Sequence, residues 1–199
     1  MRKGFSPAFT LVELLTVITI IGILAAILMG GLSIAIDAAK KAKARVEMSA
    51  LVTAIQGYDA AYARYPVSPA VLQMATAAKS DFTYGGSLLA KYAAVLGPGN
   101  YTNNNSEVIA ILMDLATYPD GTPTVNTNHV RNPQQTMFLN AHRSDDTSSP
   151  GVGTDYVYRD PWGNPYVITL DLDYDEMCED AFYPIFPRLT LQAEVIYLQ

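Results

Sequence analysis

The chain has 199 residues, of which 50% are apolar and 16% are charged, and this composition excludes an intrinsically disordered protein. The net charge of −6 excludes a general nucleic-acid binder, because contacts with phosphates need clustered Lys and Arg. The single cysteine, Cys178, excludes an internal disulfide and a cysteine-based zinc site.

An apolar run dominates the first part of the chain. It extends from Phe9 to Ile36, and Glu13 is its only charged residue. As a helix with a rise of about 1.5 Å per residue it would be roughly 42 Å long, which exceeds the ~30 Å hydrocarbon core of a bilayer. We predict a retained transmembrane helix over residues 9–36. A secretory signal peptide is the alternative, but its apolar region is only ~7–15 residues long.

Glu13 is the most informative residue of this run. An ionisable group in a membrane helix costs on the order of 2.5–3.5 kcal/mol, so it is a candidate functional residue. The apolar run offers it no partner, and a cation would have to come from another chain or from a freed amino terminus. The alternative is a side chain that reaches the lipid headgroups.

The start of the chain resembles a known signal. Ala8-Phe9-Thr10-Leu11-Val12-Glu13-Leu14-Leu15 is similar to the class III signal of type IV pilins and type II secretion pseudopilins, with residues 1–8 as a short basic leader. In that family the leader is removed before a Phe, the new amino terminus is N-methylated, and Glu is the fifth mature residue. The resemblance implies cleavage between Ala8 and Phe9, although the family usually has Gly in place of Ala8.

The resemblance also implies a role for Glu13 in assembly. In a staggered bundle of helices, Glu13 of one subunit would pair with the amino group of Phe9 on its neighbour. Because an unpaired charge in an apolar medium is expensive, this pair would favour one register between subunits.

The segment from Asp37 to Tyr65 is predicted to continue the helix of the apolar run, so that one long helix extends from Phe9 to Tyr65 and ends before Pro66. Its apolar residues recur with gaps of three and four, which favours a helix that lies across a sheet over a coiled coil. Four cations near its start form a collar that is either solvated or faces anionic headgroups. The apolar positions are Ala44, Met48, Leu51, Ile55, Tyr58, Tyr62 and Tyr65, and the collar is Lys40, Lys41, Lys43 and Arg45.

The middle of the chain gives weaker signals. We predict helices over 69–79 and over 106–118, the second with Ser106 as its N-cap. A turn is expected at 119–121, and glycine-rich loops are expected at 97–99 and 151–153.

Two β-rich runs, 156–159 and 166–170, predict a hairpin near the C-terminus. The connection between them, followed by Tyr166, is similar to the signature of the major pseudopilin of type II secretion. It consists of Asp160, Pro161, Trp162, Gly163, Asn164 and Pro165.

The acidic residues Asp171, Asp173 and Asp175 alternate after the second run. On a strand they would project from one face, and Ca²⁺ takes six to eight oxygen ligands of this kind. An EF-hand is excluded, because Glu176 stands where that loop needs Gly. Major pseudopilins hold Ca²⁺ in this region, so the resemblance implies a calcium site. The alternatives are a solvated acidic turn or a site on Glu176, Glu179 and Asp180.

The sequence does not predict an enzyme. Cys178 and His142 are the only residues that suggest a thiol pair, and neither a Walker loop nor a zinc-protease motif is present.

These observations predict an α+β, pilin-like fold, with a long membrane-spanning N-terminal helix packed on a small C-terminal antiparallel sheet. The predicted parts are a leader (1–8), a transmembrane and assembly helix (9–36) and a periplasmic globular domain (37–199). Before assembly, the chain is expected to lie in the bacterial inner membrane as a single-pass protein.

The predicted function is that of a structural subunit which polymerises into a periplasmic pseudopilus for type II protein secretion. The alternatives are a type IV pilus subunit and a monomeric membrane-anchored binding module. The expected partners are further copies of the chain, other pseudopilins, a prepilin peptidase-methyltransferase, an inner-membrane assembly platform and the membrane, but no nucleic acid. Ca²⁺ is the one expected cofactor.

Overall fold

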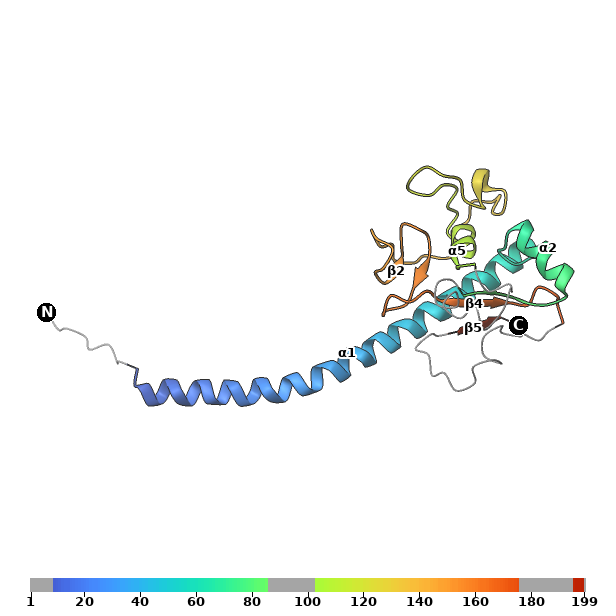
Figure 1. Ribbon diagram of the computed structural model, residues 1–199. Coiled ribbons are helices and arrows are strands. Elements are labelled where there is room, and N and C mark those ends of the chain that lie inside the picture. The colour runs from blue at the N-terminus through green and yellow to red at the C-terminus, as the bar shows by residue number, and fades with distance from the viewer. Residues whose placement is uncertain (1–8, 86–102, 176–194, 199) are drawn as a thin grey trace, which may run out of the picture. The chain divides into compact units, whose positions relative to one another are not determined.

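The computed structural model describes residues 9–85, 103–175 and 195–198, and for residues 27–31 and 195–198 it describes the backbone alone (Figure 1). The predicted leader, the glycine-rich loop at 97–99 and residues 176–180 lie outside the described residues. The chain divides into two compact units, Met1–Ala42 and Lys43–Gln199.

Helix α1 spans Leu11–Tyr62 and contains 52 residues, which confirms the prediction of one long helix through the apolar run and the segment that follows it. The helix ends where Ala63 adopts a left-handed conformation (φ 50°), ahead of Pro66. In the N-terminal unit the described large apolar side chains of α1 are exposed. Leu11 is 87% exposed and Ile21 is 59% exposed.

None of the helices in the described part of the chain combines the length and apolar character needed to cross a membrane. The predicted transmembrane helix at 9–36 is therefore wrong. The predicted single-pass location in the inner membrane, which depended on it, is wrong as well.

The second half of α1 forms one wall of the core of the second unit. Leu51, Ile55 and Tyr58 are fully buried and belong to the same apolar cluster as Tyr84 and Ile168 from the strands. The predicted apolar stripe is thus confirmed as the face of α1 that packs on the core, and its partly buried members are Met48, Tyr62 and Tyr65.

Three shorter helices follow α1 among the described residues. They are α2 (Pro69–Ala78), α5 (Ser106–Leu112) and the 3₁₀ helix η1 (Thr127–His129). Helix α5 is shorter than predicted, because Asp114 adopts a left-handed conformation (φ 55°) directly after it. Its N-cap position is held by Asn105 and not by Ser106 as predicted.

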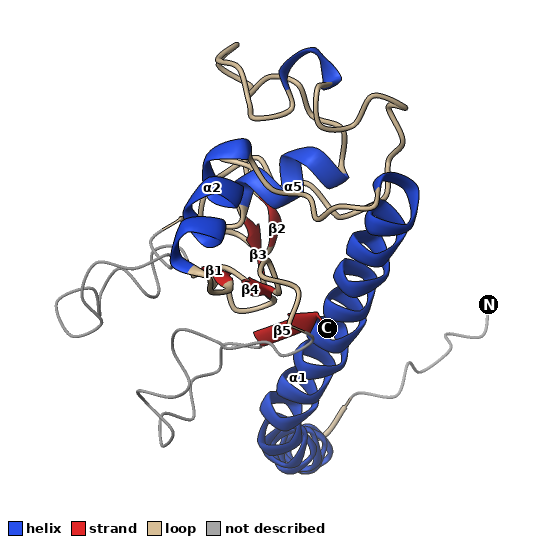
Figure 2. Cartoon of the chain, turned by 90° about the vertical axis from the view of Figure 1, so that its right-hand side faces the viewer, coloured by secondary structure: helices blue, strands red, loops and turns tan. Residues whose placement is uncertain are grey.

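The strands in the described part of the chain form two small sheets (Figure 2). In the first, β4 (Val167–Leu170) lies between β1 (Phe82–Tyr84), which is antiparallel to it, and β5 (Val195–Leu198), which is parallel to it. In the second, β2 (Gly151–Val152) pairs with β3 (Tyr158–Arg159) in antiparallel fashion.

The α+β class predicted from sequence is confirmed, but two details of the sheet differ. The larger sheet is mixed, because β5 runs parallel to β4. The two strands of the predicted hairpin, β3 and β4, belong to different sheets, and only an isolated bridge from Arg159 to Pro165 joins them. The predicted loop at 151–153 contributes the short strand β2.

Candidate functional site

Glu13 has a local partner at the start of α1. The amide and the hydroxyl of Thr10 both donate to Oε2 of Glu13 at 2.8 Å, and the amide of Glu13 donates back to the Thr10 hydroxyl at 3.2 Å. This reciprocal pattern is a capping box, with Thr10 as the N-cap and Glu13 at the third helical position. The hydrogen bonds from Thr10 lower the pKa of the Glu13 carboxyl.

Thr10 is thus a local partner that the sequence analysis did not expect, whereas the pairing of Glu13 with a cation from another chain stays a prediction. The charge is held by backbone and hydroxyl donors, which sequence reasoning overlooked although Thr10-x-x-Glu13 has the spacing of a capping box. Both bonds from Thr10 reach Oε2, and no described residue donates to Oε1. Phe9 is exposed beside this site, whereas Ala8 lies outside the described residues.

The segment with the pseudopilin-like signature forms a tight turn around Asp160. The carboxylate of Asp160 is buried and accepts hydrogen bonds from the amides of Trp162 at 2.8 Å and Asn164 at 2.9 Å. Gly163 has a φ of +89°, and a Cβ atom there would lie 2.7 Å from the carbonyl oxygen of Ser148. Only glycine therefore fits this position without strain.

Tyr166, the residue that follows the turn, links the start of β4 to α1 through a hydrogen bond. The hydroxyl of Tyr166 donates to Oε2 of Glu47 at 2.6 Å. Burial, together with this carboxylate, raises the pKa of the Tyr166 hydroxyl and keeps it protonated. Lys43, one helical turn before Glu47, forms an ion pair with it at 3.7 Å.

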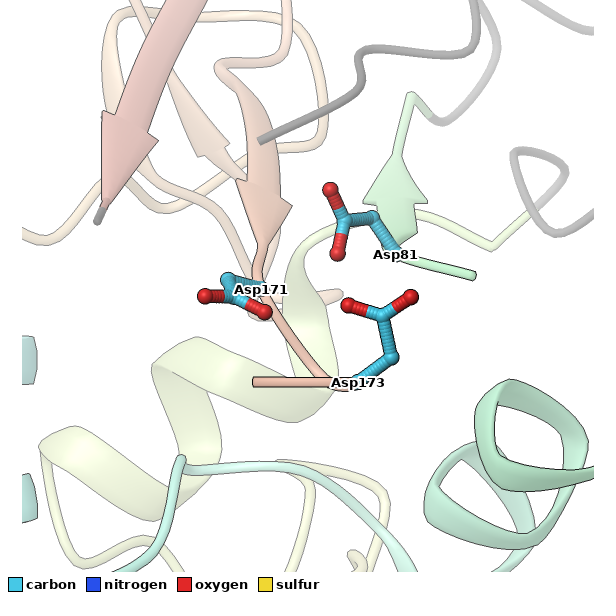
Figure 3. Close-up of side chains that lie close together, drawn as sticks. All are labelled: Asp81, Asp171 and Asp173. Carbon is cyan, nitrogen blue, oxygen red and sulfur yellow. The ribbon is translucent and has the colours of Figure 1, made fainter. Parts of the chain in front are cut away.

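Two of the three predicted metal ligands come together with a third carboxylate that the sequence did not indicate. Asp171 and Asp173, which follow β4, approach Asp81, which precedes β1 (Figure 3). One carboxylate oxygen from each residue lies within 4.8 Å of the other two. Two oxygens that each lie about 2.4 Å from a common ion are at most ~4.8 Å apart, so the spacing and the hard oxygen donors fit Ca²⁺.

The strand register explains how Asp81 reaches this place. Phe82 pairs with Leu170, so one further step along the antiparallel register brings Asp81 opposite Asp171. The sequence alone does not indicate that Asp81 lies near Asp171, because the two strands are far apart along the chain. Asp175 is exposed and is not a member of this group, while Glu176, Glu179 and Asp180 lie outside the described residues.

The residues considered for thiol chemistry form no described site. His142 is exposed, and Cys178 lies outside the described residues. The carboxylate contact of the other histidine is structural in character: Nδ1 of His129 lies 2.7 Å from Asp114, which also accepts from Asn126 at 2.9 Å.

Comparison with known proteins gives no relative for this chain. It matches no family model, no curated protein and no solved structure.

Proposed function

We propose that this chain is a structural subunit that polymerises into a filament of the pseudopilus type, which serves type II protein secretion. The observation that carries the proposal is the set of exposed apolar side chains on α1 from Leu11 to Leu24, which we call the apolar arm, together with the carboxylate of Glu13 at its start. Contiguous apolar surface of this extent on a monomer marks an interaction site. The apolar arms of other copies of the chain can bury this surface by packing against it.

The first unit supplies both groups that a register-setting contact needs. Cleavage between Ala8 and Phe9 would create a free amine at Phe9, one residue before Thr10. Because the capping box uses Oε2 of Glu13, the other oxygen remains available for the Phe9 amine of a neighbouring copy. The attraction is strong where other arms exclude water, and a misplaced neighbour would leave a charge unpaired.

The second unit supports the secretion-type filament over a type IV pilus. The turn from Asp160 to Pro165 is the segment that resembles the major pseudopilin of type II secretion. Its amide-to-carboxylate bonds and the contact between Tyr166 and Glu47 hold it against α1.

Processing provides the first test of the proposal. Mass spectrometry of the mature chain should show the loss of residues 1–8 and an N-methylated Phe9. An intact terminus at Met1, or a cut near Ser33, would contradict the pseudopilin-type function.

Substitutions at the start of α1 provide the second test, because they separate pairing from capping. Glu13→Gln keeps an oxygen for Thr10 but removes the charge, and it should lower the yield of filaments about tenfold or more, which corresponds to about 1.4 kcal/mol. Thr10→Val removes the hydroxyl of the cap and keeps Glu13 charged, so it should assemble normally. Normal filament yield from Glu13→Gln would refute the pairing.

We further propose that Asp81, Asp171 and Asp173 bind Ca²⁺. The observation that favours it is the convergence of three carboxylates at the ends of neighbouring strands. Like charges opposite one another on paired strands are destabilising, and a divalent cation would offset their repulsion. The ion would also join β1 to the segment that follows β4.

Thermal unfolding of the full chain in Ca²⁺ and in chelator tests this site. An ion that binds only the folded state stabilises it by about 2.7 kcal/mol at a hundredfold excess over Kd. Asp81→Asn should abolish the difference between the two conditions. Asp145→Asn, a control at an exposed carboxylate outside the group, should preserve it. Equal midpoints for the wild-type chain in Ca²⁺ and chelator would show that the carboxylates are only solvated.

A further inference from the structure

The second unit carries a polar groove whose lining includes a tyrosine ring. A hollow of about 720 Å³ is lined by Asn104, Tyr118, Asp120, Thr147 and Asp155, among others. A second hollow of about 390 Å³ adjoins it and shares Asn104 and Tyr118 with it. We call the two hollows together the acidic groove.

Tyr118 is held firmly in the acidic groove. Its ring stacks on that of Tyr156, with a distance of 4.8 Å between ring centroids and an angle of 20° between planes. The Tyr156 hydroxyl donates to the carbonyl oxygen of Thr117 at 2.6 Å, which fixes the stack against the neighbouring loop. A fixed tyrosine ring is a favourable surface for a cation, because its π face is negative.

The charges that line the acidic groove are negative. Asp120 and Glu107 have no ion-pair partner among the described residues, whereas Asp155 is bound by Arg159 at 2.6 Å. The amide and the hydroxyl of Thr122 donate to Oδ1 of Asp120 at 2.9 and 2.6 Å, so this exposed carboxylate is oriented in advance. Hydrogen bonds from Thr122 also lower its pKa. No Lys or Arg is among the described residues that line either hollow.

The collar on α1 has the complementary charge. Lys41 and Arg45 are exposed and lie one helical turn apart, and no described carboxylate comes within 4.0 Å of either. Like charges with this spacing weaken a helix unless something neutralises them. Lys43, in contrast, already pairs with Glu47.

We propose that the collar of one copy, through Lys41 and Arg45, docks in the acidic groove of the next copy. The contact joins two different surfaces, so each copy gives its collar to one neighbour and its groove to another. Such a head-to-tail contact builds an open helical filament when the rotation between copies does not close a ring. This inference rests on the proposed filament function, and the collar and the acidic groove are the two surfaces through which the filament would grow.

Disulfide cross-linking of the assembled full-length chain tests the contact. In a Cys178→Ser background, Ala42→Cys beside the collar is combined with Thr147→Cys in the acidic groove, both at exposed positions. Oxidation should produce a ladder of dimers, trimers and longer species. The matched control combines Ala42→Cys with Asn140→Cys, which lines a different hollow, and should give no ladder.

Charge reversal in the cross-linking pair tests the electrostatics. Asp120→Lys should reduce the ladder about tenfold, and the addition of Lys41→Glu should restore it to within about threefold of the original yield, because the two charges are then exchanged. Filaments that form without this ladder, or a ladder indifferent to Asp120→Lys, would overturn the contact and leave the filament function standing. Dimers alone would indicate a contact between identical surfaces and would also overturn it. A wild-type sequence that forms no filament would overturn both proposals.

Discussion

At the scale of single residues, buried side-chain amides organise the second unit. Asn105 is fully buried, and its amide nitrogen donates to the carbonyl oxygens of Tyr158 at 3.0 Å and Tyr166 at 2.9 Å. Its carbonyl oxygen accepts from the amide of Tyr158 at 2.8 Å. One side chain thus satisfies three backbone groups on the two segments that flank the signature turn.

Replacement of Asn105 should be among the most destabilising changes in the chain. Asn105→Ala would leave buried backbone groups unpaired at about 1–3 kcal/mol each, so we expect the free energy of unfolding to fall by about 3 kcal/mol or more. Urea unfolding can be followed through Trp162, the only tryptophan. The exposed control Asn140→Ala should change stability by less than about 0.5 kcal/mol. Equal midpoints for the two variants would refute the bridging role.

The capping box at the start of α1 predicts a dependence on pH. The hydrogen bonds from Thr10 lower the pKa of Glu13 from its ordinary value of 4.5 in the folded chain. A carboxyl with a depressed pKa contributes stability that is present above its unfolded pKa and is lost as the pH falls through its folded pKa. The protection factors of the amides in the first turn of α1, which correct for the intrinsic pH dependence of exchange, should therefore decrease on acidification below about pH 4.5.

Thr10→Ala is the direct check on that pH dependence. Without the hydroxyl donor, the pKa of Glu13 should rise towards 4.5, as measured by an NMR titration of its carboxyl carbon. Thr16→Ala provides a control, because the Thr16 hydroxyl donates to the carbonyl oxygen of Val12 and does not contact Glu13. An unchanged titration in Thr10→Ala would contradict the capping box.

At the scale of elements, α2 depends on a defined N-cap. The Ser68 hydroxyl accepts from the amide of Val71 at 3.3 Å, and Pro69 follows at the first helical position. We expect Ser68→Ala to destabilise the chain by about 1 kcal/mol, because the Val71 amide loses its partner in a buried site. Ser68→Asp keeps an acceptor and should restore most of that stability. The difference between the urea midpoints of the two variants measures the cap.

The sequence predicted the helices better than the strands, for a physical reason. Helix α1 has an apolar stripe over several turns and a proline after its end, and α2 begins with Ser-Pro. Strands β1 and β2 have three and two residues, too few for an alternating pattern to develop. Their pairing depends on partners far along the chain. The same distance hid Asp81 from the predicted calcium site.

Local hydrogen-bond competition explains the errors at the start of α5. Serine is a residue type that is common at N-caps, but the amide of Ser106 donates to the side-chain oxygen of Asn104. The preceding Asn105 uses its amide group for β3 and Tyr166 and does not cap the helix. Hydrogen bonds of Asn104 and Asn105 therefore determine how α5 begins, whereas local residue preference alone indicated Ser106 as the N-cap.

At the scale of the whole molecule, the exposed apolar side chains and the buried core belong to different units. The buried core lies within Lys43–Gln199, and the exposed apolar arm lies within Met1–Ala42. A chain that begins at Asp37 should therefore unfold at the same urea midpoint as the full chain. A lower midpoint would show that the exposed apolar part of α1 contributes to the stability of the fold.

The central position of β4 also has a consequence for the time course of folding. Thr83 and Thr169 meet across β1 and β4 although they are 86 residues apart, and a parallel partner such as β5 requires a crossover connection. Contacts of this separation form slowly, whereas helices form within microseconds. Until β1 and β5 have paired with β4, the unpaired backbone groups on both edges of β4 can form hydrogen bonds with another chain. Newly synthesised molecules are thus most prone to misassociation before the sheet closes, and slower synthesis at lower temperature should raise the yield of native chain.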